Sequence, residues 1–135
     1  MVPLISMPPR VFRVLVAGDD DRVRHALAFF LDSFDDLLTI GEAVSPIQTV
    51  ELCAQLRPDV VLVDFSESEK DWIDAVRAIA RSNLHIPVVG LIGSLNAALV
   101  REMLQAGAVI GLQRGLVTVE GVVDAIYTAV QHDDH

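Results

Sequence analysis

Two patterns of apolar and polar positions alternate along this chain. Short, almost unbroken apolar runs lie at 11–17, 38–43, 60–63, 88–92 and 108–112. Because such a run has no polar face, it is typical of a strand buried on both sides, as in a parallel sheet. The stretches between the runs repeat apolar residues every three or four positions, which predicts amphipathic helices. The sequence therefore predicts an α/β protein, with five strands alternating with five helices that cover both faces of a parallel sheet.

Residues that begin or end helices lie between these runs. Asp20 or Asp21 is the expected N-cap of the first helix, and Ser45, followed by a proline, begins the second. The third helix is expected over 72–83, after a polar loop. Gly107 is the expected C-cap of the fourth helix.

One domain accounts for all the predicted elements. We expect it to cover residues 11–131, with a flexible N-terminal arm at 1–10 and a polar tail at 132–135. No apolar run reaches the length needed to span a membrane. Because the only cysteine is Cys53, a disulfide framework is excluded, and we expect a cytoplasmic protein.

The charge balance limits the partners. Hydrophobic residues make up 52% of the chain and charged residues 21%, as in an ordinary packed domain. The net charge of −9 repels nucleic acid and anionic membrane surfaces. We therefore expect no direct nucleic-acid binding by this chain and no membrane binding.

The third apolar run ends on a carboxylate, Asp64. Ligands of open α/β sheets bind at this edge, where parallel strands end. The loop after the first strand opens on the same edge, so Asp19 should face Asp64. Two carboxylates repel each other unless a cation or a proton lies between them, and Mg²⁺ is the natural oxygen-ligated cation. Asp20 is a further candidate ligand, and the backbone carbonyl of Ser66 would point the same way.

The chain resembles the receiver domain of bacterial response regulators over about residues 11–130. The resemblance lies in VLVAGD at 14–19, RPDVVLVD at 57–64 and AGA at 106–108. GEA at 41–43 is similar to the branch of the family that often carries helix-turn-helix output domains. The resemblance implies a flavodoxin-like (βα)5 three-layer sandwich with strand order 2-1-3-4-5. It also implies a role in a phosphorelay, that is, in two-component signal transduction.

The same resemblance assigns roles to residues. Asp64 would be the phospho-acceptor, phosphorylated by a histidine kinase, and Mg²⁺ would be held by Asp19, Asp64 and the carbonyl of Ser66. The chemistry is a carboxylate attacking a phosphoryl group whose charge a metal and a cation neutralise. The chain would not be an enzyme beyond slow self-phosphorylation and dephosphorylation at Asp64.

The sequence departs from the family at most other site positions. Gly18 replaces the first acid of the metal-binding pair, so metal affinity should fall unless Asp20 takes its place. Ile92 stands where a hydroxyl should bond the phosphoryl group, and Gly111 where an aromatic residue should swing inward. Without these two residues, no contact remains to favour a second conformation.

Arg114 stands at the position of the family's lysine. It keeps the positive charge, but as a planar fork that is not equivalent to an ammonium. It could bind a phosphate, or it could pair directly with Asp64 or Asp19 in the place of the metal.

These departures favour an atypical, degenerate receiver, or pseudo-receiver, that acts by binding a partner protein, with phosphorylation weak or absent. The first alternative is a working phospho-receiver that uses Asp64 with Mg²⁺. A remote alternative is a small Mg²⁺-dependent phosphohydrolase, which would need a second acid where Ser66 stands. A flavin-binding module is disfavoured because the acidic loop at 19–21 would repel a phosphate.

The expected partner is a histidine kinase or another signalling protein. A homodimer through the last two helices is a second expectation, with Leu99, Met103 and Leu116 as its apolar surface.

Overall fold

A five-stranded parallel sheet in the order β2-β1-β3-β4-β5 forms the centre of the computed structural model, which describes residues 10–132. The predicted fold class and strand order are therefore confirmed. The elements are β1 (Phe12–Gly18), α1 (Asp21–Leu31), β2 (Leu37–Ala43), α2 (Pro46–Leu56), β3 (Val60–Phe65), α3 (Glu69–Arg81), β4 (Val88–Ile92), α4 (Ala97–Ala106), β5 (Ile110–Gln113), the short 3₁₀ helix η2 (Arg114–Leu116) and α5 (Val119–His132).

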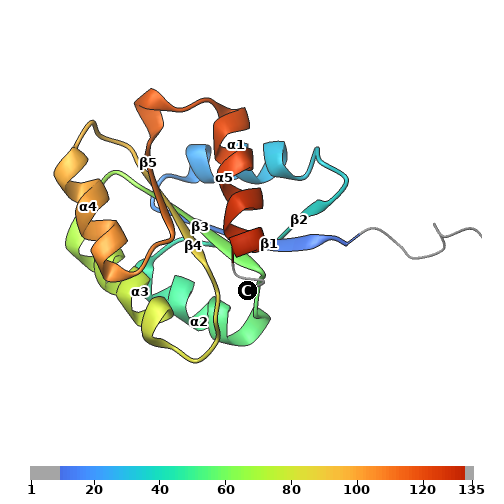
Figure 1. Ribbon diagram of the computed structural model, residues 1–135, viewed down its shortest axis with the longest axis horizontal. Coiled ribbons are helices and arrows are strands. Elements are labelled where there is room, and N and C mark those ends of the chain that lie inside the picture. Colours follow the sequence, from blue (N-terminus) through green and yellow to red (C-terminus); the bar gives the residue numbers. More distant parts are fainter. Residues whose placement is uncertain (1–9, 133–135) are drawn as a thin grey trace, which may run out of the picture.

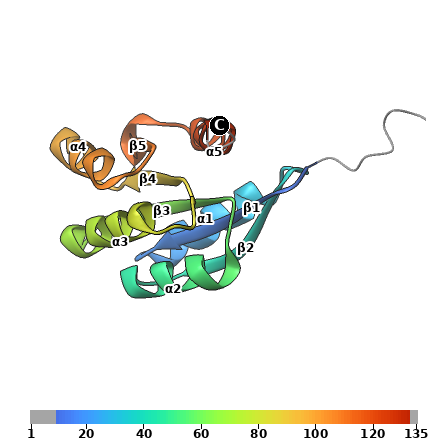
Figure 2. The same cartoon turned by 60° about the horizontal axis from the view of Figure 1, so that its bottom comes forward.

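Helices cover the sheet on both faces, which gives three layers (Figures 1 and 2). α1 and α5 pack on one face through one apolar cluster, and α2, α3 and α4 pack on the other face through a second cluster. β3 lies in the middle of the sheet, and all six of its residues are buried. This explains why its apolar run is unbroken, since both of its faces are covered.

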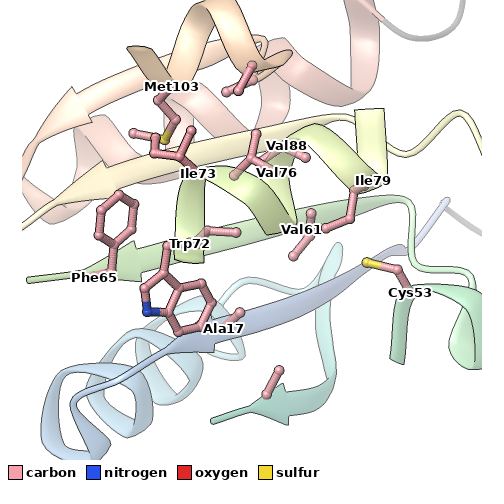
Figure 3. Packing of buried hydrophobic residues seen from close by; sticks show 14 of the residues in the cluster. Ala17, Cys53, Val61, Phe65, Trp72, Ile73, Val76, Ile79, Val88 and Met103 are labelled. Carbon is pink, nitrogen blue, oxygen red and sulfur yellow. The ribbon is translucent and has the colours of Figure 1, made fainter. Parts of the chain in front are cut away.

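The larger cluster contains a stacked aromatic pair. Phe65 at the end of β3 stacks on Trp72 of α3, with 6.1 Å between the ring centroids (Figure 3). Met103 of α4 lies in the same cluster and is fully buried, and Leu99 is only 3% exposed. The prediction that Leu99 and Met103 form an apolar surface is therefore wrong, because α4 turns both side chains toward the sheet. Leu116, in contrast, is 72% exposed.

Two predicted helix boundaries are sharpened by the structure. Asp20, not Asp21, is the N-cap of α1, and its Oδ1 accepts hydrogen bonds from the backbone N–H groups of Arg22 and Val23. α3 begins at Glu69, three residues before the predicted start, and ends at Arg81. The first turn of α3 is polar and acidic, which is favourable at the positive end of a helix. Because this turn has no apolar residue, the spacing of apolar residues does not indicate where the helix begins.

The strand boundaries differ by one or two residues. β1 starts and ends one residue later than predicted, at Phe12 and Gly18, and β5 covers Ile110–Gln113 instead of 108–112. The N-terminal arm predicted at 1–10 and the tail predicted at 132–135 lie outside the described residues, apart from Arg10 and the backbone of His132. Within the described part of the chain, no helix is both long and apolar enough to cross a membrane.

Candidate functional site

The carboxyl ends of the central strands bring the predicted site residues to one edge of the sheet. Gly18 of β1 pairs with Asp64 of β3, and Asp64 in turn pairs with Leu91 of β4. Ile92 pairs with Gln113, the residue before Arg114. Because these strands are parallel, the loops that follow them open side by side, as the sequence predicts.

Arg114 forms an ion pair with Asp64 at this edge. Its Nη2 lies 2.8 Å from Asp64 Oδ1, and its Nε donates a second hydrogen bond to the same oxygen at 3.2 Å. Nη2 also donates to the hydroxyl of Ser66 at 3.2 Å. The side chain of Asp64 is 1% exposed and that of Arg114 is 34% exposed. The pair therefore joins a buried anion to a cation that still reaches solvent.

Gly93 leaves the space that the guanidinium of Arg114 occupies. A Cβ atom at position 93 would lie 2.7 Å from Arg114 Nη2 and would overlap the hydroxyl of Ser66. Sequence patterns alone do not single out Gly93. The available signal was a glycine directly after Ile92, at the sheet edge that carries the other site residues.

The second oxygen of Asp64 has no such partner. Oδ2 is buried and accepts no hydrogen bond from the described residues. Burial raises the pKa of Asp64 above its ordinary value, the two hydrogen bonds and the charge of Arg114 oppose this, and the nearby charges of Asp19 and Asp20 add to it. Raising the pKa means that the environment disfavours the ionised carboxylate in spite of the arginine.

The two neighbouring aspartates, Asp19 and Asp20, accept hydrogen bonds from backbone N–H groups. Asp19 Oδ2 accepts a hydrogen bond from the backbone N–H of Glu67 at 3.1 Å, which ties the loop after β1 to the loop after β3. Asp20 caps α1. Together with Asp21, Arg22 and Ser66, these residues line an open acidic pocket of about 470 Å³.

This arrangement does not fit Mg²⁺. Gly18 offers no carboxylate, and Arg114 already holds Asp64 Oδ1. Among residues 10–132, no group of three or more acidic, histidine or cysteine side chains is placed to hold a metal ion. Hard cations such as Mg²⁺ need several oxygen ligands, so the pairing with Arg114 and metal binding by the same oxygen exclude each other.

Arg24 is a buried part of the site that was not among the residues predicted from the sequence. It is 3% exposed and donates to the backbone carbonyl of Gly18 at 2.9 Å, to Glu42 at 3.0 Å and to Asp21 at 2.6 Å. It therefore fixes the end of β1 next to Asp64. Its place on the inward stripe of α1, three residues before Leu27, was the available signal.

Ile92 and Gly111, the two other positions at which the sequence departs from the family pattern, are closely packed. Ile92 is fully buried and has no hydroxyl. At Gly111, a Cβ atom would lie 3.0 Å from Val100 Cγ1 of α4. An aromatic side chain could enter there only if α4 or its side chains moved. The described site thus holds an aspartate and an arginine, with no hydroxyl at position 92 and no side chain at position 111.

A family model for the response regulator receiver domain matches residues 14–116. The chain is 33% identical over 119 residues to the transcriptional regulatory protein LiaR of Bacillus subtilis, a match that covers 88% of this chain and 56% of LiaR. It is 34% identical over 98 residues to the response regulator GacA of Pseudomonas viridiflava, covering 73% of this chain and 46% of GacA. The chain spans about half the length of these curated relatives.

Solved structures show the same architecture. The response regulator domain of Thermotoga maritima CheB superimposes with a TM-score of 0.80 at 26% identity, covering 90% of this chain and 98% of that domain. The signal receiver domain of the putative response regulator NarL from Mycobacterium tuberculosis gives a TM-score of 0.82 at 25% identity, covering 91% and 98%.

Proposed function

Because the chain belongs to the response regulator receiver domain family of two-component signalling, we propose that it is an atypical receiver in which an arginine holds the phospho-acceptor position. Asp64 then has a structural role, and aspartyl phosphorylation is weak or absent. The domain acts by contact with another protein.

The observation that carries this proposal is the pair between Asp64 and Arg114. Phosphorylation needs a free carboxylate oxygen and a cation that neutralises the incoming phosphoryl group. Here the guanidinium of Arg114 donates two hydrogen bonds to Oδ1, and the side chain of Asp64 is almost fully buried. A metal ion that needs Oδ1 would have to displace Arg114 before Oδ2 could attack a metal-bound phosphoryl group.

The groups around the pair support the same proposal. Ile92 is apolar and Gly111 has no side chain, so a phosphorylated state would gain no new contact there. A ligand shifts a conformational equilibrium only through contacts that differ between the two states. Asp19, Asp20 and Glu67 add negative charge at the mouth of the site, which repels a phosphate donor.

Incubation of the intact chain with Mg²⁺ and acetyl phosphate, followed by intact-mass spectrometry, tests the proposal. We expect little or no addition of a phosphoryl group, at the level of an Asp64→Asn control. Rapid and near-complete addition at Asp64 would contradict the proposal.

A second variant shows whether Arg114 is the obstacle. In Arg114→Ala, both oxygens of Asp64 are without the guanidinium, so Mg²⁺ binding measured by calorimetry should become stronger than in the unmodified chain. Arg101→Ala removes an exposed arginine of α4 and is the matched control. Equal Mg²⁺ affinity in all three proteins would show that Arg114 does not block the site.

One observation favours a working phospho-receiver as a second candidate. Asp64 Oδ2 is buried without a hydrogen-bond partner among the described residues, beside the acidic pocket lined by Asp19, Asp20 and Ser66. Unsatisfied buried oxygens are rare and often mark a functional group. This candidate requires Arg114 to give up Oδ1 to a metal ion, and the phosphodonor experiment separates it from the first.

Receiver domains interact with histidine kinases and other signalling proteins, and we propose a partner of this kind. A homodimer through α4 and α5 remains a second proposal, now without Leu99 and Met103, which are buried. Chromatography with light scattering over a range of concentrations measures the dimer directly. A mass that stays at one chain would exclude it.

A further inference from the structure

A groove separates α2 from α3 on the outer side of one helical layer. The two helices lie side by side against the sheet (Figure 2), and the groove between them has a volume of about 430 Å³. On the α3 side it is lined by Ala75 and Ala78, whose small side chains leave the space between the helices open. None of its described lining residues belongs to the pair of Asp64 and Arg114.

Apolar side chains of α2 border this groove and remain open to solvent. Ile47 is 75% exposed, and Val50, almost one turn further along α2, is half-buried. Covering these side chains would remove apolar area from water, which is favourable in proportion to the area covered. An apolar groove between two helices is a surface on which an amphipathic helix of a partner can lie.

Among residues 10–132, the charged side chains that line the groove are all acidic. They are Asp71 and Asp74, both of α3. Asp74 pairs with Arg77 at 3.0 Å, but the side chain of Asp71 makes no hydrogen bond or ion pair with another described residue. Arg77 and Lys70 line a different pocket, between α3 and α4. The unpaired charge in the groove is therefore negative.

The start of α2, which also lines the groove, offers little to an anion. Anions bind at the beginning of a helix through free backbone N–H groups. Pro46 has no N–H, the N–H of Gln48 bonds to the hydroxyl of Ser45 at 3.1 Å, and the N–H of Thr49 bonds to the carbonyl of Ser45 at 3.0 Å. The groove is therefore complementary to a ligand that is apolar and positively charged.

The larger groove, between α1 and α5, differs in this respect. It has a volume of about 530 Å³. Two arginines line it, but Arg114 is paired with Asp64, and Arg22 also lines the acidic pocket with Asp19 and Asp20. Its charges therefore favour neither an anion nor a cation.

We propose that the groove between α2 and α3 binds an amphipathic helix of a partner protein that carries basic residues beside its apolar stripe. The apolar residues of that helix lie against Ile47 and Val50, and a lysine or arginine pairs with Asp71. This inference rests on the proposed contact with another protein and makes it specific. Because the groove contains neither Asp64 nor Arg114, a failure of this inference leaves the proposal about phosphorylation standing.

Titration of the isotope-labelled chain with a synthetic helical peptide of leucine and lysine, followed through amide chemical shifts, tests the proposal. We expect saturable shifts at groove residues such as Ile47 and Ala78. A peptide with glutamate in place of lysine should not bind, because Asp71 repels it. A peptide with serine in place of leucine should bind about tenfold more weakly or not at all, because it covers no apolar area.

Two pairs of variants locate the binding site. Asp71→Asn should weaken binding of the leucine–lysine peptide about two- to fivefold, as expected for an exposed ion pair. Asp35→Asn makes the same change of charge at an exposed residue before β2 and should have no such effect. Ile47→Ala should weaken binding about tenfold. Leu95→Ala is its control, because Leu95 is also exposed but does not line the groove.

Three results would overturn the proposal. Equal weakening by Asp71→Asn and Asp35→Asn would indicate a general attraction to an acidic chain. Shifts confined to the groove between α1 and α5 would place the peptide on the other face of the sheet. Shifts of Ile47 and Ala78 caused by protein concentration alone would identify a second copy of the chain as the occupant. The circular dichroism spectrum of each variant should stay that of the parent chain, since the substituted residues are all exposed.

Discussion

At the scale of single residues, the main feature of the site is the set of hydrogen bonds and charges around one buried carboxylate, that of Asp64. Arg114 neutralises Asp64 from one side, while Oδ2 accepts no hydrogen bond from residues 10–132. A buried charge is stabilised only when its partner and its remaining hydrogen bonds are all in place. Asp64 is therefore held in position, but its ionised form is not fully compensated.

The first prediction concerns the pH dependence of this residue. Because burial raises the pKa of Asp64, the folded chain binds this proton more tightly than the unfolded chain does. The stability of the parent chain relative to Asp64→Asn should therefore increase as the pH falls through the raised pKa. The increase is complete below the unfolded pKa of about 3.9. Urea unfolding of both proteins at about pH 7 and about pH 4 measures it. A relative stability that falls toward acid would mean that Arg114 outweighs burial and lowers the pKa.

Gly18 carries the second prediction. A Cβ atom at this position would lie 2.6 Å from the backbone oxygen of Asp64, and a backbone atom cannot move aside as a side-chain end can. Gly18→Ala should therefore lower the free energy of unfolding by about 1–3 kcal/mol. Gly115→Ala is the control, since its Cβ would lie 3.4 Å from a side-chain atom of Leu95. If both variants are equally stable in urea, the close approach of β1 and β3 is not rigid.

At the scale of elements, side chains fix the ends of helices and strands around the sheet. Arg24 of α1 holds the carbonyl that ends β1. On the same face of the sheet, Tyr127 of α5 donates a hydrogen bond of 2.5 Å to Asp36, directly before β2. The first contact fixes the sheet edge that carries Asp64. The second joins α5 to the turn before β2, at the opposite edge of the parallel sheet.

The third prediction uses the bond between α5 and the turn before β2. Burial, together with the hydrogen bond and the charge of Asp36, raises the pKa of Tyr127 to about 12. Because Tyr127 is the only tyrosine, absorbance of tyrosinate against pH reads this group alone. We expect its midpoint well above the ordinary value of about 10. A midpoint at the ordinary value would show that the hydrogen bond is not maintained in solution.

Tyr127→Phe measures the contribution of the same bond to stability. It removes only the hydroxyl, so the free energy of unfolding should fall by about 1 kcal/mol. Thr128→Val is a suitable control because Thr128 is exposed and its hydroxyl bonds within α5 only. An unchanged Tyr127→Phe variant would mean that solvent satisfies both groups equally well.

At the scale of the whole molecule, the two apolar clusters share one sheet and should unfold together. Trp72, the only tryptophan, is 1% exposed and stacks on Phe65 in the centre of one cluster. The fourth prediction is that its fluorescence and the far-ultraviolet circular dichroism follow the same urea transition. Separate midpoints would show that the layer of α2, α3 and α4 opens independently.

Sequence patterns predicted the fold well because burial on both faces makes each strand an unbroken apolar run. They missed the start of α3, because the first turn of this helix is polar and Trp72 is its first apolar residue. They placed Asp64, Asp19 and Arg114 at one edge, since parallel strands all end on the same side. They did not identify Gly93 or Arg24. Gly93 matters because it leaves space for the guanidinium of Arg114, and Arg24 matters because it donates a hydrogen bond to the backbone carbonyl of Gly18. Such features exist only once the chain is folded.

Arg114 borders both the pair with Asp64 and the groove between α1 and α5. A ligand in the groove that contacted this guanidinium would be thermodynamically linked to the Asp64 pair. Linkage is reciprocal, so a ligand that weakens the ion pair by some factor binds more tightly by the same factor once the pair is broken. One arginine would then let an event in the groove change the ionisation of a buried aspartate, with no phosphate involved.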